Sequence, residues 1–138
     1  MQTRLQWQLH KISFLLEKKA DEQLKQSVGI GYAQYKVLEA IYQHDLTKQN
    51  VVAALLDQTE ASISRQVKIL QSKGLITVKE VMGNKRAREL SLTRVGEEVI
   101  RQSALAVEEA QGDSITQLNY QEQSLMLEML ERMLDKLQ

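Results

Sequence analysis

The stretch that decides the fold runs from Thr59 to Gly74 and reads TEASISRQVKILQSKG. Thr59 is of a type that favours a helix N-cap, and Glu60 follows where a carboxylate complements the helix dipole. Lys73 and Gly74 close the stretch with a cation near the last turn and a C′ glycine. Both ends of one helix are therefore marked in the sequence.

This helix has two faces. Ile63, Val67 and Leu70 recur at i, i+4 and i+7, which predicts a buried stripe. The other faces are polar and basic, with no acid after the first turn, and carry Ser62, Ser64, Arg65, Lys68 and Gln71. Such a face is either a solvated surface or a binding surface, and the helix alone does not decide between the two.

A second, shorter helix is expected just before this one. It spans about residues 48 to 56, with Thr47 as its N-cap, and only residues 57 to 59 separate the two helices. Two helices joined by a three-residue turn, the second with a basic outer face, predict a helix-turn-helix. Residues 60 to 72 would then be its recognition helix.

A β-hairpin is expected after the recognition helix. Residues 75 to 81 are rich in β-branched side chains, Gly83-Asn84 is a turn signal, and residues 87 to 92 alternate polar and apolar. The tip, residues 82 to 86, carries two adjacent cations. These fit the negative potential of a DNA minor groove, or they simply keep a strand edge soluble; their place after a helix-turn-helix favours the first interpretation.

Helices are expected on both sides of this region. Apolar residues spaced by three or four predict helices at about residues 3 to 26 and 32 to 43. Thr93 caps another helix, which ends between residues 111 and 116, and Asn119 opens a last one. The first and last helices are apolar over more of their circumference than one contact needs, which suggests burial between subunits.

Composition and charge set further limits. The chain has 138 residues, of which 43% are hydrophobic and 26% charged, which fits a single, mostly helical domain. The net charge is zero, yet residues 59 to 94 carry +5 and residues 95 to 138 carry −6. Positive charge concentrated in one third of the chain is the pattern of a surface that binds an anionic polymer.

Other classes of protein are disfavoured. There is no cysteine, no apolar run near the roughly 20 residues of a membrane span and no signal peptide, so a cytoplasmic location is expected. His10 and His44 have no partner at metal or catalytic-triad spacing, and Gly29 and Gly31 belong to no phosphate-binding motif. We therefore expect no enzyme activity, no cofactor, no metal and no membrane partner.

The order of these features, from the two leading helices through Lys73-Gly74-Leu75 to Leu92-Thr93-x-x-Gly96, resembles the MarR family of bacterial transcriptional regulators. The resemblance covers nearly the whole chain. Matching segments are Ile30-Gly31-Tyr32-Ala33-Gln34-Tyr35, Ile63-Ser64-Arg65, and Asn84-Lys85-Arg86 followed by Leu92-Thr93. Two positions depart from the family pattern: Gly31 stands where a threonine is usual, and Asn84 where an aspartate is usual.

The resemblance implies a mostly α (α+β) fold. A winged helix-turn-helix lobe at residues 30–92 would be flanked by dimerisation helices at residues 1–29 and 93–138. It further implies a homodimer that inserts two recognition helices into successive major grooves of a pseudo-palindromic operator in double-stranded DNA. Such proteins are most often repressors, and a small-molecule effector in a cleft between the dimerisation helices and the DNA-binding lobe would release them.

Candidate site residues follow from the sequence and from the resemblance. On the recognition helix, Ser62, Ser64, Arg65 and Lys68 would face bases or phosphates, with Arg65 the first candidate for guanine. The wing would add Lys85, Arg86 and Arg88, with Arg86 in the minor groove, and Lys79 and Arg94 would contact phosphates. Trp7, His10 and Tyr35 are weak candidates for the effector pocket, core packing being favoured for each. The alternative function is a winged-helix protein-interaction module.

Overall fold

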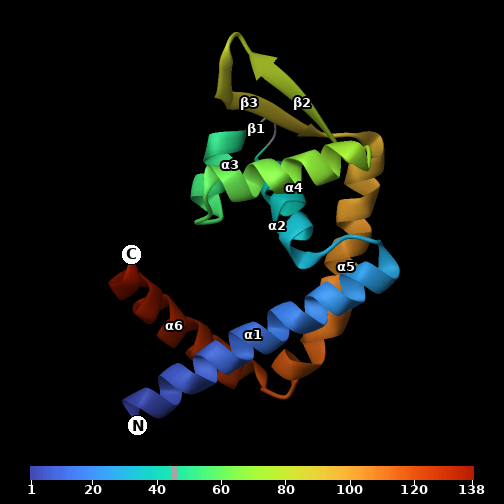
Figure 1. The fold of residues 1–138 in the computed structure, drawn as a ribbon. Helices are drawn as coiled ribbons and strands as arrows, with labels where there is room; N and C mark the ends of the chain where they lie inside the picture. Colours follow the sequence, from blue (N-terminus) through green and yellow to red (C-terminus); the bar gives the residue numbers. More distant parts are fainter. Residues whose placement is uncertain (45–46) are drawn as a thin grey trace.

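The computed structural model describes residues 1–44 and 47–138, but not the side chains of Lys85 and Arg86. Helices dominate the chain, and three short strands form one small antiparallel sheet (Figure 1). The elements in order are α1 (Gln2–Ser27), α2 (Tyr32–Gln43), β1 (Thr47–Lys48), α3 (Gln49–Leu55), α4 (Glu60–Ser72), β2 (Ile76–Val81), β3 (Asn84–Leu92), α5 (Arg94–Thr116) and α6 (Tyr120–Leu137). The expected mostly helical winged helix-turn-helix is confirmed.

Three of the helices begin at the side-chain caps expected from the sequence. Thr59 Oγ1 accepts a hydrogen bond from the Ser62 amide at 3.1 Å, and Thr93 Oγ1 accepts one from the Gly96 amide at 3.0 Å. Asn119 opens α6 with a capping box: its Oδ1 accepts from the Glu122 amide at 2.9 Å, and the Asn119 amide donates to the Glu122 carboxylate at 2.8 Å. These caps are local, so a short window of sequence predicts them.

Thr47 was expected to cap α3, and this expectation is wrong. Thr47 lies in β1 instead, where it pairs with Leu90 of β3, and its side chain is buried. The N-cap of α3 is Lys48, which makes no side-chain capping bond. The physical reason is that pairing with a strand more than forty residues away holds the backbone of Thr47 extended.

The turn between α3 and α4 contains no glycine, and Asp57 takes the role a glycine often has. Asp57 has a φ of 52°, in the left-handed region that aspartate tolerates better than most residues. The Gln58 amide then donates to the Ala53 carbonyl at 3.0 Å, which closes the end of α3. This turn sets the direction of α4 relative to α3.

The hairpin tip is tighter than expected. Val81 pairs with Asn84, so the turn itself is Met82-Gly83, with Gly83 at a φ of 72°. The expectation that residues 82 to 86 form a loop is therefore wrong for the last three of them, which lie in β3. The pairing is irregular between Lys79 and Val81, so the outer part of the hairpin bends away from a regular ladder.

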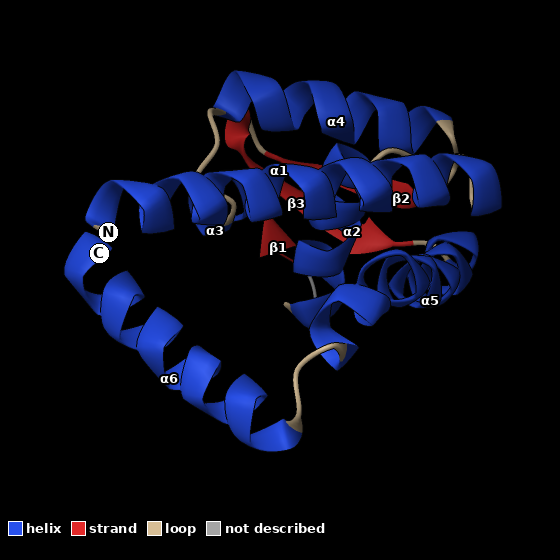
Figure 2. Ribbon diagram, turned by 90° about the horizontal axis from the view of Figure 1, so that it is seen from below, coloured by secondary structure: helices blue, strands red, loops and turns tan. Residues whose placement is uncertain are grey.

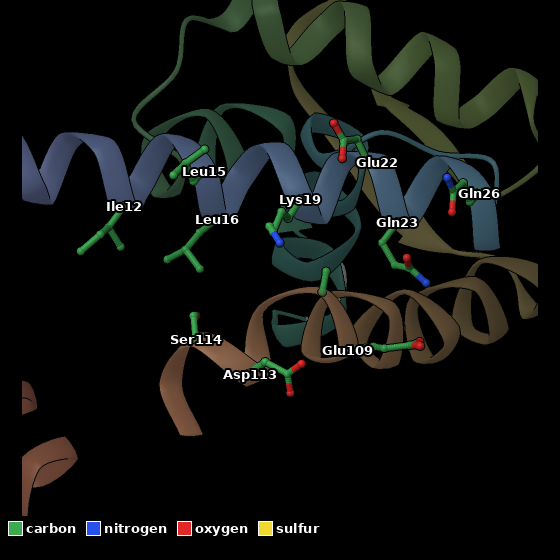
Figure 3. Close-up of a pocket in the computed structure, with 11 residues that line it drawn as sticks. Ile12, Leu15, Leu16, Lys19, Glu22, Gln23, Gln26, Glu109, Asp113 and Ser114 are labelled. Atoms are coloured by element: carbon green, nitrogen blue, oxygen red, sulfur yellow. The ribbon is translucent and has the colours of Figure 1, made fainter. Parts of the chain in front are cut away.

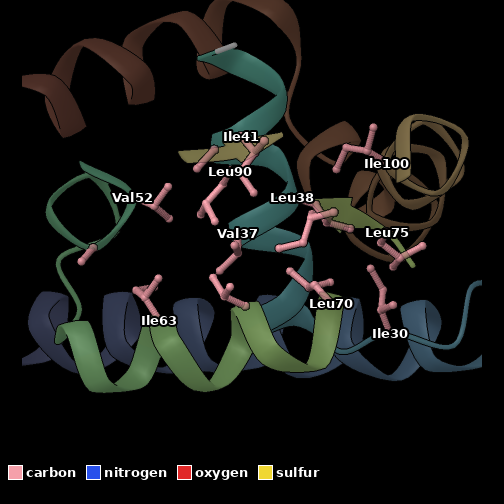
Figure 4. Close-up of a cluster of buried hydrophobic side chains, with 14 residues drawn as sticks. Ile30, Val37, Leu38, Ile41, Val52, Ile63, Leu70, Leu75, Leu90 and Ile100 are labelled. Carbon is pink, nitrogen blue, oxygen red and sulfur yellow. The ribbon is translucent and has the colours of Figure 1, made fainter. Parts of the chain in front are cut away.

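One core holds the helix-turn-helix and the sheet together. The stripe Ile63, Val67 and Leu70 of α4 is fully buried, as expected, and packs with α2, α3 and the sheet (Figure 4). The other members of this cluster are Ile30, Val37, Leu38, Ala40, Ile41, Val52, Ala53, Leu75, Ile76, Leu90 and Ile100. Because Ile100 belongs to α5, the start of that helix is part of the same core.

The terminal helices extend away from this core. α1 packs mainly against α5, where Ala20 and Leu24 are completely buried. α6 has no buried residue and stands apart from the rest of the chain (Figure 2). Within the described residues, no helix is long and apolar enough to cross a membrane.

Candidate nucleic-acid interface

The outward stripe of α4 is polar and basic. Ala61, Arg65, Lys68 and Ser72 are exposed and follow one another at i, i+4, i+7 and i+11, so they share one side of the helix. That side lies opposite the buried stripe, because each of its members is two residues, about 200°, from a buried one. Two cations therefore stand at the middle of an open helix face.

The two serines of α4 flank this stripe. Both are half-buried, and Ser62 Oγ donates to Gln58 Oε1 at 3.2 Å in the turn before the helix. Ser62 thus helps to hold the turn, whereas Arg65 and Lys68 are exposed. Ala61 shares the exposed stripe, and the sequence did not single it out because an alanine carries no polar signal.

The candidate residues of the hairpin and of the first turn of α5 differ in exposure. Lys79 on β2 is exposed, and so is Arg94 at the first turn of α5. Arg88 differs: its guanidinium pairs with Glu80 at 3.2 Å, its side chain is only 19% exposed, and its Nε is buried without a hydrogen-bond partner among the described residues. The side chains of Lys85 and Arg86, the two wing-tip candidates, lie outside the described part.

The basic residue that follows α4 as its C-cap has an internal partner. Lys73 Nζ donates to the carbonyl oxygen of Gly29 at 2.7 Å, in the loop between α1 and α2. A second bond joins the same region to α4, because Gln34 Nε2 donates to Gln66 Oε1 at 3.2 Å. The sequence did not indicate either contact, since both join residues more than thirty positions apart.

The wing is anchored where α5 begins. Thr93 Oγ1 donates to the Gly74 carbonyl at 2.7 Å, and the Thr93 amide donates to the Leu75 carbonyl at 3.0 Å. An ideal Cβ on Gly96 would lie 2.0 Å from that same Leu75 oxygen, so only glycine fits this close approach. The contact fixes the end of α4 and the start of β2 against α5.

The three effector candidates do not meet within one chain. Trp7 is 72% exposed, and it lines a shallow hollow with Thr3, Gln6 and His10 on α1. Tyr35 lies elsewhere: it belongs to α2, lines another hollow together with residues near the end of α3, and packs partly buried against the core. The expected core packing is therefore wrong for Trp7 and His10, since both lie on the open surface of α1, and the effector pocket stays a prediction.

The chain also has a larger hollow between α1 and α5, which none of the three candidates lines. It has a volume of about 570 Å³ (Figure 3). Apolar side chains of α1, among them Ile12 and Leu16, form one wall, and Asp113 and Ser114 of α5 form part of the other. Its mixed lining and its open shape fit a surface between helices better than a closed ligand site.

Comparisons with known proteins agree with this geometry. The model of the MarR family matches residues 28–87, which include α2, the helix-turn-helix and the hairpin tip. A search of curated protein sequences finds no match. Among solved structures, the chain is similar to MepR of S. aureus in complex with DNA, with 28% identity, 96% coverage of both chains and a TM-score of 0.83.

Two further structures extend the comparison. MepR, described as a transcription regulator of the S. aureus multidrug efflux pump MepA, has 27% identity to the chain, coverage of 96% and 98%, and a TM-score of 0.72. MarR of S. aureus in complex with salicylate and kanamycin has 20% identity, coverage of 99% and 91%, and a TM-score of 0.89, a likeness of fold. The MarR family model thus matches the DNA-binding lobe, and the full-length likeness to MepR shows that the chain as a whole has the same winged helix-turn-helix fold.

Proposed function

We propose that this protein is a sequence-specific, DNA-binding homodimer that regulates transcription, acting as a repressor that an effector releases. One observation carries the proposal: α4 presents Arg65 and Lys68 on an exposed stripe opposite its buried stripe. A recognition helix needs this arrangement, because one face must pack on the lobe while the other enters a major groove. MepR, which is similar over 96% of both chains, is bound to DNA in its complex.

The residues divide by role. Arg65 is the candidate for reading a guanine, because its guanidinium can donate two hydrogen bonds to the O6 and N7 acceptors. Lys68, Lys79 and Arg94 would contact phosphates, which positions the protein without reading sequence. Ser62 and Ser64 would lie at the edge of the DNA-contacting face of α4. Lys85 and Arg86 would enter the minor groove beside it.

Dimerisation follows from the apolar surfaces that the single chain leaves open. Trp7 and Phe14 on α1 are 72% and 65% exposed, and Leu137 on α6 is 80% exposed. Other exposed apolar side chains on these helices are Leu5, Ile12, Leu15, Leu125, Met126, Leu127, Met129, Met133 and Leu134. Large apolar side chains left exposed in such numbers on two helices mark an interaction site, so residues 1–29 and 93–138 are proposed as the dimerisation region.

Release by an effector rests on the spacing of the two recognition helices. A dimer engages two half-sites only when these helices stand about one helical turn, roughly 34 Å, apart. A ligand that favours another spacing would therefore lower affinity for the operator. MarR of S. aureus binds salicylate in its complex, which supports a small-molecule effector here as well.

The test is DNA binding by the purified protein across about 50 to 200 mM salt. One duplex carries the protein's own promoter, and an unrelated duplex of equal length is the control. A dimer with several phosphate contacts should lose orders of magnitude of affinity over this range while it keeps a preference for its own site. Weak, equal binding to both duplexes would contradict the proposal and favour a protein-interaction module.

A further inference from the structure

The loop that joins α1 to α2 is held by both neighbouring helices. From α4 and its C-cap, Gln66 accepts a hydrogen bond from Gln34 at 3.2 Å, and Lys73 Nζ donates to Gly29 O at 2.7 Å. From α1, Asp21 Oδ1 accepts a hydrogen bond from the Tyr32 amide at 2.9 Å. Residues 29–34, called the joint below, therefore link the long first helix to the recognition helix.

The contact made by Asp21 replaces a cap that α2 lacks. Its N-cap residue is Gly31, which has no side chain to accept a bond from the first amides of the helix. An ideal Cβ on Gly31 would lie 3.0 Å from Asp21 Oδ1. The carboxylate of α1 thus occupies the space where the side chain of a serine or threonine cap would begin, and it caps α2 from another helix.

Asp21 is held firmly in this place. It lies next to Ala20, which is completely buried, and its Oδ2 pairs with Lys25 Nζ at 2.8 Å. The bonds from Lys25 and from the Tyr32 amide hold the pKa of Asp21 below its ordinary value, so the carboxylate stays charged at neutral pH. A charged acceptor at a helix N-terminus is also favoured by the helix dipole.

We propose that Asp21 is a positioning residue for DNA binding, which fixes the orientation of α1 relative to the recognition helix through the joint. This inference rests on the proposed function. Because α1 belongs to the proposed dimerisation region, its angle to the DNA-binding lobe sets the spacing of the two α4 helices in the dimer. A local cap at Gly31 would stabilise α2 equally well, but it would not bond the start of α2 to α1.

That difference gives a test with a pair of substitutions. Asp21→Ala removes the cap and the tie to α1, and should lower the melting temperature by roughly 3 to 6 °C. Adding Gly31→Ser returns a local cap, and the missing carboxylate leaves room for its Cβ. The melting temperature of the double variant should return to within about 2 °C of the wild type.

DNA binding separates the two roles of Asp21. On the promoter duplex, which engages both lobes, the double variant should still bind at least about fivefold more weakly than the wild type. On a duplex cut to one half-site, the two proteins should bind equally, because one lobe needs no fixed spacing. Glu22→Ala is the matched control, because it removes a neighbouring exposed carboxylate of α1. It should change neither the melting temperature nor the affinity for the promoter duplex.

Equal binding of the promoter duplex by the double variant and the wild type would overturn the inference and leave Asp21 as a cap only. It would leave the proposed function standing, because the wild type would still bind its promoter. If the wild type shows no preference for its promoter, the proposed function fails first. Hydrogen exchange at the Tyr32 amide would then test the bond between Asp21 and α2 directly. The amide should exchange faster in Asp21→Ala than in the wild type. Unchanged exchange would overturn the capping contact.

Discussion

Replacing Gly96 by alanine should cost far more stability than a glycine-to-alanine change in a helix usually does. The new Cβ would lie 2.0 Å from the Leu75 carbonyl oxygen, whereas side-chain Cβ atoms essentially never approach within 3.0 Å. The backbone at Leu75 or at the start of α5 must therefore move by about 1 Å. Leu75 is only 4% exposed, so no open space receives that movement.

The cost can be estimated from the contacts that such a shift disturbs. The Thr93 amide donates to Leu75 O at 3.0 Å, and Thr93 Oγ1 donates to Gly74 O at 2.7 Å. Two hydrogen bonds at about 1 kcal/mol each, with about 1 to 3 kcal/mol for overpacking, give a loss of roughly 3 to 5 kcal/mol. The same shift loosens the wing, so DNA affinity should fall as well.

Gly112 in the same helix provides the control. An ideal Cβ there meets nothing within 4 Å, so Gly112→Ala should stabilise the protein by up to about 1 kcal/mol through helix propensity. Urea unfolding, followed by circular dichroism at one fixed protein concentration, measures both variants. The reasoning is refuted if Gly96→Ala unfolds within about 1 kcal/mol of the wild type, or if both variants lose equal stability.

Four further outcomes are expected. In salt-dependent titrations, Arg65→Ala should reduce the preference for the promoter over an unrelated duplex by about 5- to 150-fold. Lys68→Ala should instead weaken binding to both duplexes and lower the slope of log affinity against log salt concentration by about one. The lowered pKa of Asp21 means that its carboxylate stabilises the fold above about pH 4 and that this stability is lost as pH falls through the folded-state pKa. Asp21→Asn should therefore reduce the difference between the urea-unfolding midpoints measured at about pH 6 and at about pH 3. An unchanged difference would contradict this prediction. Asn119→Ala should destabilise α6 by about 1 kcal/mol because it removes the N-cap, and circular dichroism should show a lower helix content. Leu134→Glu should shift sedimentation toward monomer, and an unchanged dimer would place the interface elsewhere.

Much of the fold could be predicted from the sequence because its helix ends are marked locally. Thr59, Thr93 and Asn119 each bond to an amide three residues later, so a window of four residues carries the signal. The buried stripe of α4 likewise follows from helical periodicity alone. Local patterns therefore predict the helix-turn-helix and its hairpin without any contact between distant residues.

A local sequence pattern fails, or leaves a contact unidentified, where distant residues decide the local structure. Thr47 has the side chain of a helix cap, yet pairing with Leu90 places it in a strand. Gly31 has no capping side chain, and the missing cap comes from Asp21 on another helix. In both cases the deciding partner is set by the tertiary fold, which a local pattern does not contain.

The candidate site was predicted in part for the same reason. Periodicity placed Arg65 and Lys68 on the outer face of α4, and the structure leaves both exposed there. Arg88 carries the same charge, but its pairing with Glu80 across the hairpin was invisible in the sequence. The resemblance suggests Trp7 and Tyr35 as lining residues of one effector cleft, whereas the fold keeps them on separate surfaces of the chain.

The most direct test of the account is a hydroxyl-radical footprint of the wild-type protein on its own promoter. A dimer that places two α4 helices in successive major grooves should protect two patches on one face of the duplex, about one helical turn or 10 base pairs apart. Arg65→Ala should weaken both patches together, because each recognition helix carries one copy of the residue. A single protected patch, or uniform protection without preference for the promoter, would contradict the account.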